Sequence, residues 1–136
     1  MPETGVRTAR WLLAVVVFLI VYGSLFPFRF EDAGIDSLAA LRAGLPWART
    51  TRSDVVANVL LYLPFGACLA WMLAPRLGAA LAFLAALACG ALLSTAIEVA
   101  QIYETRRVSS LADITFNTLG AGGGAALALV LSLIHI

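Results

Sequence analysis

The chain has 136 residues, of which 62% are hydrophobic and only 12% are charged, and its mean hydropathy is +0.96. Soluble domains are roughly half apolar, so this composition indicates a membrane protein. Nine arginines and eight acidic residues leave a formal net charge of +1, and no basic tract points to nucleic acid. We therefore expect the lipid bilayer as a partner and exclude nucleic acid binding.

Four apolar runs are long enough to cross about 30 Å of hydrocarbon as helices. They cover approximately residues 11–28, 55–74, 77–102 and 111–136. The first run follows Arg7 and Arg10, as a signal peptide would, but no small-x-small cleavage site follows it, so we expect a retained anchor. The predicted fold is all-α, a polytopic bundle of four transmembrane helices that forms a single domain over residues 1–136.

The connection between the first and second runs is the longest polar stretch. Asp36 or Ser37 can cap a short helix there, which Gly44 and Pro46 would close. The apolar residues on one side of this helix would be Ile35, Leu38, Leu41 and Leu45. We expect either a short interfacial helix or an ordinary solvated loop.

Small residues and one proline mark the expected contacts between helices, because lipid supplies no hydrophobic drive for their association. Pro64 removes a backbone hydrogen bond in the second run and is expected to bend it close to Gly66. Small residues recur every four positions in the third run and include Gly90, and the fourth run has Gly120 and Gly124 in GxxxG spacing. These five residues are predicted packing positions, although a homo-oligomer interface uses the same pattern.

Polar residues gather where the second run begins, the third ends and the fourth begins. Since the chain crosses once per run, these three ends lie on the same membrane face. The candidate ligand-binding residues are Asn58, Tyr62, Glu98, Gln101, Arg106, Arg107, Asp113 and Asn117. Within each run they are three or four residues apart and share a helix face. We therefore expect a polar pocket beneath one leaflet.

Several chemistries are open to this cluster. Arg106 and Arg107 are suited to bidentate binding of a lipid phosphate. Glu98 and Asp113 are the catalytic candidates, as general acid and base, or else they only pair with the arginines and join the helices. Carboxylate and amide oxygens also suit Mg²⁺ or Ca²⁺, whereas zinc is not expected because the single histidine, His135, lies at the far end of the last run. An intramembrane carboxylate favours a functional pocket, and we predict no cofactor and no resident metal.

A set of motifs extends over nearly the whole chain, from about residue 11 to 131. It comprises Leu25-Phe26-Pro27, the segment from Asn58 to Gly66, Ser94-x-x-Ile97-Glu98-x-x-Gln101, Arg107, and Asp113-x-x-x-Asn117-x-x-Gly120. This set resembles the VanZ-like membrane protein family. The resemblance implies a multi-pass protein of the bacterial cell (inner) membrane, in a family named for reduced susceptibility to glycopeptides such as teicoplanin, and it implies no reaction. The family often has an acidic residue where this sequence has Ser110.

Three functions stay open from the sequence. The leading hypothesis is a protein that binds an anionic envelope lipid or lipid-linked precursor at the polar cluster. The alternatives are a membrane-embedded acid/base enzyme acting on a lipid phosphate, and a structural helix-bundle scaffold or partner subunit. A transporter is least favoured because four spans enclose little room for alternating access. Six arginines in the first and third loops, against three in the N-terminal segment and second loop, predict a cytoplasmic cluster.

Overall fold

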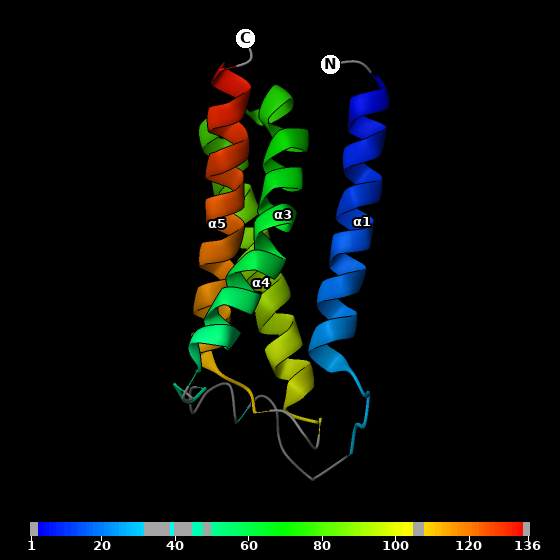
Figure 1. Ribbon diagram of the computed structural model, residues 1–136, viewed down its shortest axis with the longest axis vertical. Coiled ribbons are helices and arrows are strands. Elements are labelled where there is room, and N and C mark those ends of the chain that lie inside the picture. Colours follow the sequence, from blue (N-terminus) through cyan, green and yellow to red (C-terminus); the bar gives the residue numbers. More distant parts are fainter. Residues whose placement is uncertain (1–2, 32–38, 40–44, 48–49, 105–107, 135–136) are drawn as a thin grey trace.

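The computed structural model describes residues 3–31, 39, 45–47, 50–104 and 108–134. Its helices are α1 (Glu3–Leu25), α3 (Arg52–Leu77), α4 (Ala79–Gln101) and α5 (Leu111–Ile134), which form one bundle (Figure 1). All four are long and apolar enough to cross a membrane. The described residues contain no strand, only an isolated β-bridge between Phe30 and Glu104. The prediction of an all-α bundle with four membrane-spanning helices is confirmed.

The ends of α1 and α3 differ from the expected ones. α1 starts at Glu3 and stops at Leu25, before the predicted end at residue 28. Its stop has a local cause, because the residue before Pro27 is disfavoured in helical conformation and Phe28 has a φ of 61°. α3 continues through Pro75 and ends at Leu77, three residues after the expected end at residue 74.

Two capping arrangements explain why α3 has these limits. At its start, the Thr51 hydroxyl accepts from the Asp54 N–H at 3.3 Å, and the Asp54 carboxylate accepts from the Thr51 N–H at 3.0 Å. This reciprocal capping box satisfies two backbone donors and favours a helix beginning at Arg52. At its end, Gly78 has a φ of 80°, a conformation that glycine adopts at little cost, and the chain reverses there into α4.

Helices α3 and α5 form the closest pair in the bundle. A Cβ atom at Gly66 would overlap the backbone of Ala121, and one at Gly124 would overlap the backbone of Leu63. Each helix thus brings its backbone directly against the other, which is how transmembrane helices associate without a hydrophobic drive. Gly90 places α4 against the same region, since a Cβ there would lie 2.5 Å from the Ala121 methyl group.

α1 is the peripheral helix. It contacts mainly α3 and to a lesser extent α4, and Figure 1 shows it beside α3, away from α5. Ile20 is its fully buried residue, and it joins a core cluster that contains Tyr62 and Phe65. α1 is therefore anchored to the bundle near its middle and C-terminal half.

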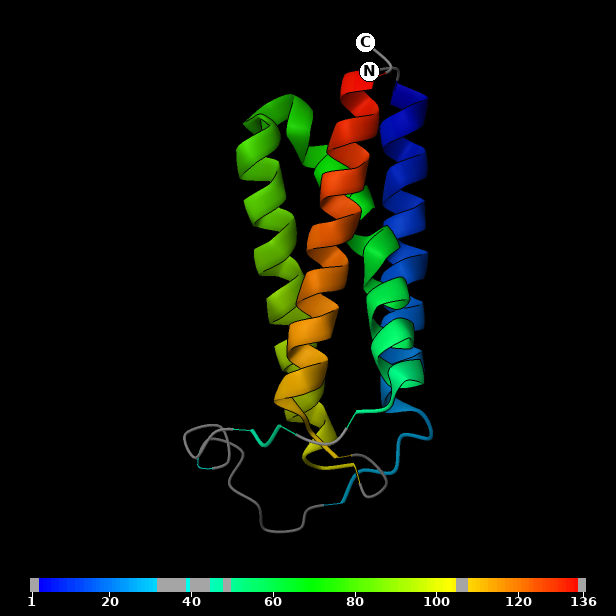
Figure 2. The same cartoon turned by 60° about the vertical axis from the view of Figure 1, so that its left-hand side comes forward.

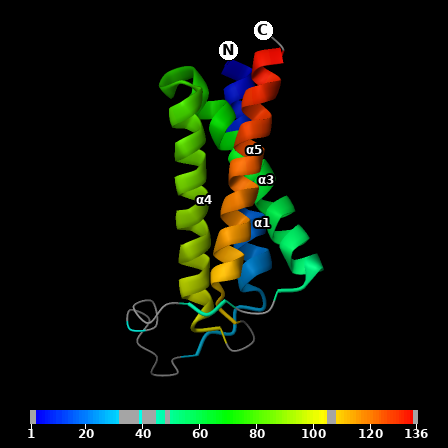
Figure 3. The ribbon, with the colours of Figure 1, turned by 90° about the vertical axis from the view of Figure 1, so that its left-hand side faces the viewer.

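The arrangement of the ends decides where the polar residues meet. Both termini lie at one end of the bundle, and the first and third loops lie at the other (Figure 1). The end of α4 and the beginning of α5 lie at this loop end (Figure 2). α3 slants across the bundle, so that its beginning diverges from the end of α4 toward the loop end (Figure 3). The interfacial helix expected within residues 36–45 falls outside the described residues except for Ala39 and Leu45.

Candidate functional site

A cavity of about 460 Å³ lies among the four helices at the loop end of the bundle. The end of α1, the beginning of α3, the end of α4 and the beginning of α5 all contribute to it. The lining residues are Gly23, Ser24, Asp54, Ala57, Asn58, Leu61, Ile97, Glu98, Gln101, Val108, Asp113 and Asn117. We call it the polar cavity, because carboxylates and carboxamides form much of its wall.

The polar side chains of α3, α4 and α5 form two layers at this end. The outer layer contains Asn58, Glu98 and Asp113, and the inner layer contains Tyr62, Ser94 and Asn117. In every helix the two members are four residues apart, so the inner member lies about one turn further from the loops on the same face. The outer layer and Asn117 line the polar cavity, whereas Tyr62 and Ser94 are not among its lining residues.

Hydrogen bonds in the outer layer connect helices to one another and to the third loop. Asn58 Nδ2 donates to Asp113 Oδ1 at 2.9 Å and so joins α3 to α5. The Glu98 side chain is only 2% exposed, and its Oε2 accepts from the Ser110 backbone N–H at 2.6 Å. The Ser109 hydroxyl donates to the Glu98 backbone carbonyl at 2.7 Å. Glu98 therefore fixes the end of α4 against the residues that precede α5.

The inner layer contains polar atoms whose hydrogen-bonding capacity is not used. Asn117 Nδ2 donates to Ser94 Oγ at 2.9 Å, but Asn117 Oδ1 is buried and has no hydrogen-bond partner. The Tyr62 hydroxyl is also buried without a hydrogen-bond partner, although Ser94 and Glu98 lie near it. A buried polar group without a partner costs about 1–3 kcal/mol, so two in one layer indicate a place for a water molecule or a ligand.

Gln101 connects α4 to the peripheral helix. Its Nε2 donates to the backbone carbonyl of Ser24 at 2.9 Å, at the end of α1. α1 contributes Gly23 and Ser24 to the polar cavity, so this bond also closes one side of the wall. A carboxamide is suited to this position because its nitrogen can donate to a carbonyl while its oxygen accepts from another group.

A model of the VanZ/LLP1 family matches residues 9–132. The chain belongs to the VanZ/LLP1 family. This confirms the resemblance read from the motifs, and the matched range includes every described residue of the polar cavity. No curated protein and no solved structure matches the sequence.

The structure brings together most of the side chains that the sequence of this VanZ/LLP1 family member suggested. Five of them line the polar cavity, namely Asn58, Glu98, Gln101, Asp113 and Asn117. Both catalytic candidates, Glu98 and Asp113, are among these five. Tyr62 lies in the inner layer and packs with Phe65 in the core cluster. Arg106, Arg107 and His135 fall outside the described residues.

Other polar residues take part in the site without having been predicted to bind a ligand. Asp54 lines the cavity and also caps α3. Ser110 precedes α5, and its Oγ accepts from the Ala112 N–H at 3.1 Å. The spacing Ser110-x-x-Asp113 before an apolar run is a helix-start signal that points to this role. Glu104, in the third loop, is only 3% exposed, and no sequence pattern distinguishes it.

The suggestion of a Mg²⁺ or Ca²⁺ site receives no support from the geometry. Within the part of the chain that the structure describes, no group of three or more His, Cys, Asp or Glu side chains is placed to hold a metal ion. The carboxylates of the outer layer are instead engaged in hydrogen bonds to an amide and to a backbone N–H.

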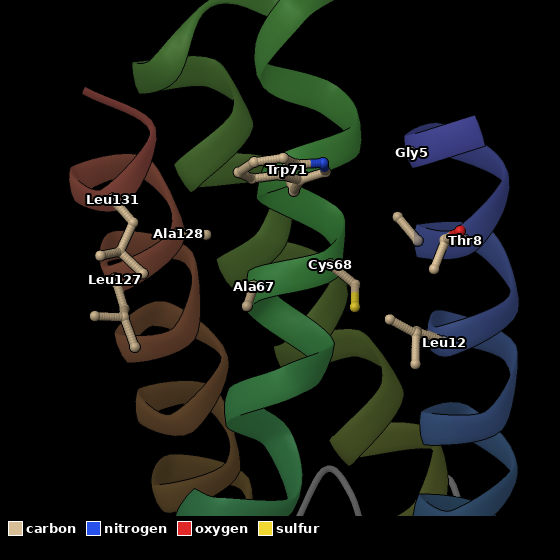
Figure 4. A pocket seen from close by; sticks show the side chains of 10 residues that line it. Gly5, Thr8, Leu12, Ala67, Cys68, Trp71, Leu127, Ala128 and Leu131 are labelled. Atoms are coloured by element: carbon tan, nitrogen blue, oxygen red, sulfur yellow. The ribbon is translucent and has the colours of Figure 1, made fainter. Parts of the chain in front are cut away.

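A second cavity, of about 550 Å³, has a different character and lies toward the end of the bundle that holds both termini. Leu12 of α1 faces Cys68 of α3 across it, Trp71 lies above them, and Leu127 and Leu131 contribute from α5 (Figure 4). Its wall is almost entirely apolar, so it suits hydrocarbon chains of the bilayer. The two cavities occupy opposite ends of the bundle, and of the two only the polar cavity is lined by carboxylates and carboxamides.

Proposed function

We propose that this VanZ-like membrane protein binds the headgroup of an anionic envelope lipid, or of a lipid-linked precursor, in the polar cavity. One observation carries the proposal: carboxylates and carboxamides from three spanning helices converge on a single cavity in an otherwise apolar bundle. An ionised side chain at the centre of a spanning helix costs about 2.5–3.5 kcal/mol on insertion scales. Proteins contain ionised side chains within the membrane where these side chains are paired or where they bind a ligand.

The position and size of the polar cavity support a headgroup as the ligand. It lies where the spanning helices meet the loops, the level at which a lipid carries its polar part. Its volume of about 460 Å³ falls in the range of roughly 300–1,000 Å³ typical of small-molecule sites. The hydrocarbon chains of the same lipid would remain in the bilayer beside the apolar helix surfaces.

The anionic part of the ligand is expected at the mouth of the cavity. Arg106 and Arg107 directly precede Val108, which lines the cavity, and arginine binds phosphate through two parallel hydrogen bonds. Deeper in the cavity, Glu98 and Asp113 would repel a phosphate group. We therefore place the phosphate next to the arginines and the remainder of the headgroup further inside.

Native mass spectrometry of the purified protein with phosphatidylglycerol tests this proposal. Arg107→Ala is expected to lower lipid retention about tenfold or more, since a hydrogen bond to a charged group contributes roughly 1.5–3 kcal/mol. Arg76→Ala removes an exposed arginine at the opposite end of the bundle and serves as the control. Equal retention by Arg107→Ala and Arg76→Ala would contradict the proposal.

A membrane-embedded enzyme is the second candidate, and it rests on the presence of Glu98 and Asp113 in the same cavity. A general acid and a general base acting on one lipid phosphate require two such groups within reach of the substrate. The protein reconstituted with a phospholipid or an isoprenoid phosphate should then convert it, and Glu98→Gln should stop the conversion. A lipid recovered unchanged would leave binding as the function.

We further propose that the protein resides in the bacterial cell (inner) membrane and lowers susceptibility to teicoplanin-type glycopeptides. The family membership and the four spanning helices support this proposal. Expression in a susceptible bacterium should raise the inhibitory concentration of teicoplanin, and Glu98→Gln should abolish the increase. If the polar cluster is only a structural scaffold, Glu98→Gln will lower the thermal stability and change no lipid or drug response.

A further inference from the structure

Hydrogen bonds fix the orientation of two carboxamides around the polar cavity, those of Asn58 and Gln101. Asn58 donates to a carboxylate oxygen and Gln101 donates to a backbone carbonyl oxygen. Neither acceptor carries a proton to give, so the amide nitrogen must face it in each case. Asn117 Nδ2 donates to the Ser94 hydroxyl. Each of the three amide nitrogens thus uses one N–H within the protein, and the amide oxygen of Asn117 is left as a buried acceptor.

The inner layer offers both an acceptor and a donor that the protein does not use. Asn117 is 6% exposed and Tyr62 is 1% exposed, so both are more than nine-tenths buried. Asn117 lines the cavity, and its Oδ1 can only accept, whereas the Tyr62 hydroxyl can donate and accept. Ser94, the third member of the layer, is uncharged as well. The inner layer, which meets the cavity at Asn117, is thus polar, neutral and incompletely hydrogen-bonded.

We infer that the inner layer binds a hydroxyl group of the headgroup, so that the ligand is a lipid carrying a polyol or a sugar. A hydroxyl group donates to Asn117 Oδ1 and accepts from Tyr62, and it adds no charge. This inference rests on the proposed function and specifies its ligand class. A glycerol headgroup and a glycosylated lipid share the required chemistry.

Two other common headgroup chemistries fit less well. A phosphate oxygen only accepts, so it would leave Asn117 Oδ1 without a donor and would lie one turn from the Glu98 carboxylate. An ammonium group only donates, so it would leave the Tyr62 hydroxyl hydrogen without an acceptor and would bring a charge into a neutral layer. The wall of α3 from Asp54 to Leu61 is about 10 Å long at 1.5 Å per residue, which accommodates a phosphate at the mouth and a hydroxylated group behind it.

Lipids with identical acyl chains separate these possibilities when their retention is compared by native mass spectrometry. The set comprises phosphatidic acid, phosphatidylglycerol, phosphatidylethanolamine and a diglycosyl diacylglycerol. Phosphatidylglycerol should be retained about two- to tenfold better than phosphatidic acid, the range that one net hydrogen bond provides. If the diglycosyl lipid is retained better than phosphatidic acid, a sugar can also supply the hydroxyl group. If the diglycosyl lipid is not retained, the hydroxyl group is that of glycerol.

Tyr62→Phe is the decisive variant, because it removes a hydroxyl that makes no hydrogen bond within the protein. It should reduce the preference for phosphatidylglycerol over phosphatidic acid to near unity. Tyr22→Phe makes the same chemical change on the exposed aromatic face of α1 and should leave the preference intact. Asn117→Leu provides a second variant, with its folding checked by thermal unfolding because it also removes the bond to Ser94.

Two results would overturn the inference. One is equal retention of phosphatidic acid and phosphatidylglycerol by the unmodified protein, and the other is a preference that Tyr62→Phe and Asn117→Leu both leave unchanged. Stronger retention of phosphatidylethanolamine than of phosphatidylglycerol would assign the inner layer to an ammonium group and would also overturn it. Failure of the proposed function looks different, since no phosphorylated lipid would then be retained and Arg107→Ala would have no effect.

Discussion

Glu98 makes two of the connections that hold the third loop to the bundle. Its side-chain oxygen accepts from the Ser110 backbone N–H, and its own carbonyl accepts from the Ser109 hydroxyl. Because the Ser110 N–H is buried, it depends on this carboxylate for its hydrogen bond. Glu98 therefore has a structural role whatever ligand the polar cavity takes.

Two substitutions of Glu98 should distinguish the contribution of its hydrogen bond to stability from the contribution of its charge. Glu98→Ala leaves the Ser110 N–H without its acceptor and should lower the free energy of unfolding by about 1–3 kcal/mol. Glu98→Gln retains an oxygen that can accept the same bond, so its loss should be smaller. Denaturant unfolding in detergent micelles, followed by tryptophan fluorescence, measures both. Equal losses would show that the charge, and not the bond to Ser110, stabilises this end of the bundle.

At the residue scale, sequence spacing predicted which side chains share a face, but not their partners. Asn58 and Asp113 were expected in the same cluster, and the structure pairs them at 2.9 Å. The bond from the Ser110 N–H to Glu98 was not expected, because every residue except proline has a backbone N–H and the sequence does not indicate which acceptor it meets. Glu104 was missed for a related reason, since it is buried where it forms a β-bridge with Phe30, a residue distant in the sequence.

At the scale of helices, the α3–α5 contact depends on glycines whose missing side chains let two backbones meet. A Cβ at Gly120 would lie 2.6 Å from the Val59 carbonyl oxygen, and one at Gly124 would overlap Leu63. A Cβ at Gly123 would meet nothing within 4 Å, although this residue is on the same helix and adjacent to Gly124. The GxxxG spacing distinguishes the two kinds of position, because residues four apart share a face.

Gly124→Ala and Gly123→Ala form a matched pair that tests this packing. Gly124→Ala must push α5 away from α3 and should destabilise the protein by about 1–3 kcal/mol, the usual cost of overpacking. Gly123→Ala adds the same methyl group toward lipid and should cause no loss. Thermal unfolding of the two variants side by side provides the measurement. A similar loss in both would contradict this packing, because the higher helix propensity of alanine should favour both variants and only Gly124→Ala meets the backbone of α3.

The limits of the helices were less predictable than their existence. Apolar length is a strong signal, so all four spans were found. Their ends follow from local hydrogen bonds, such as the capping box of Thr51 with Asp54, and from the backbone conformation of Gly78. The predicted end of α3 was too early because Pro75 lies within the last turn of the helix, and Gly78 terminates it.

For the whole molecule, the bundle has two unlike ends. Both termini are at one end and the first and third loops are at the other (Figure 1). The apolar cavity lies toward the end with the termini (Figure 4), and the lining residues of the polar cavity belong to the loop end. The excess of arginine in the first and third loops predicts that the end with the polar cavity faces the cytoplasm. The ligand would then come from the cytoplasmic leaflet.

Cysteine labelling tests this orientation. Arg29→Cys lies in the first loop and Arg76→Cys at the opposite end, both at exposed positions. A membrane-impermeant thiol reagent should label Arg76→Cys in intact cells and Arg29→Cys only in inverted vesicles. Cys68 and Cys89 lie within spanning helices and are replaced by alanine beforehand. The opposite labelling pattern would place the polar cavity in the outer leaflet.

The sequence by itself determined the membrane class, the number of spans and the gathering of polar residues at one face. These properties depend on apolar length and on the order of the helices, which the linear pattern contains. Only the tertiary structure decided that Asn58 meets Asp113, that Glu98 meets Ser110, and that Tyr62 and Asn117 keep unused hydrogen-bonding capacity. Such pairings depend on the rotation and close approach of each helix, which side-chain packing and glycine contacts set between segments distant in the chain.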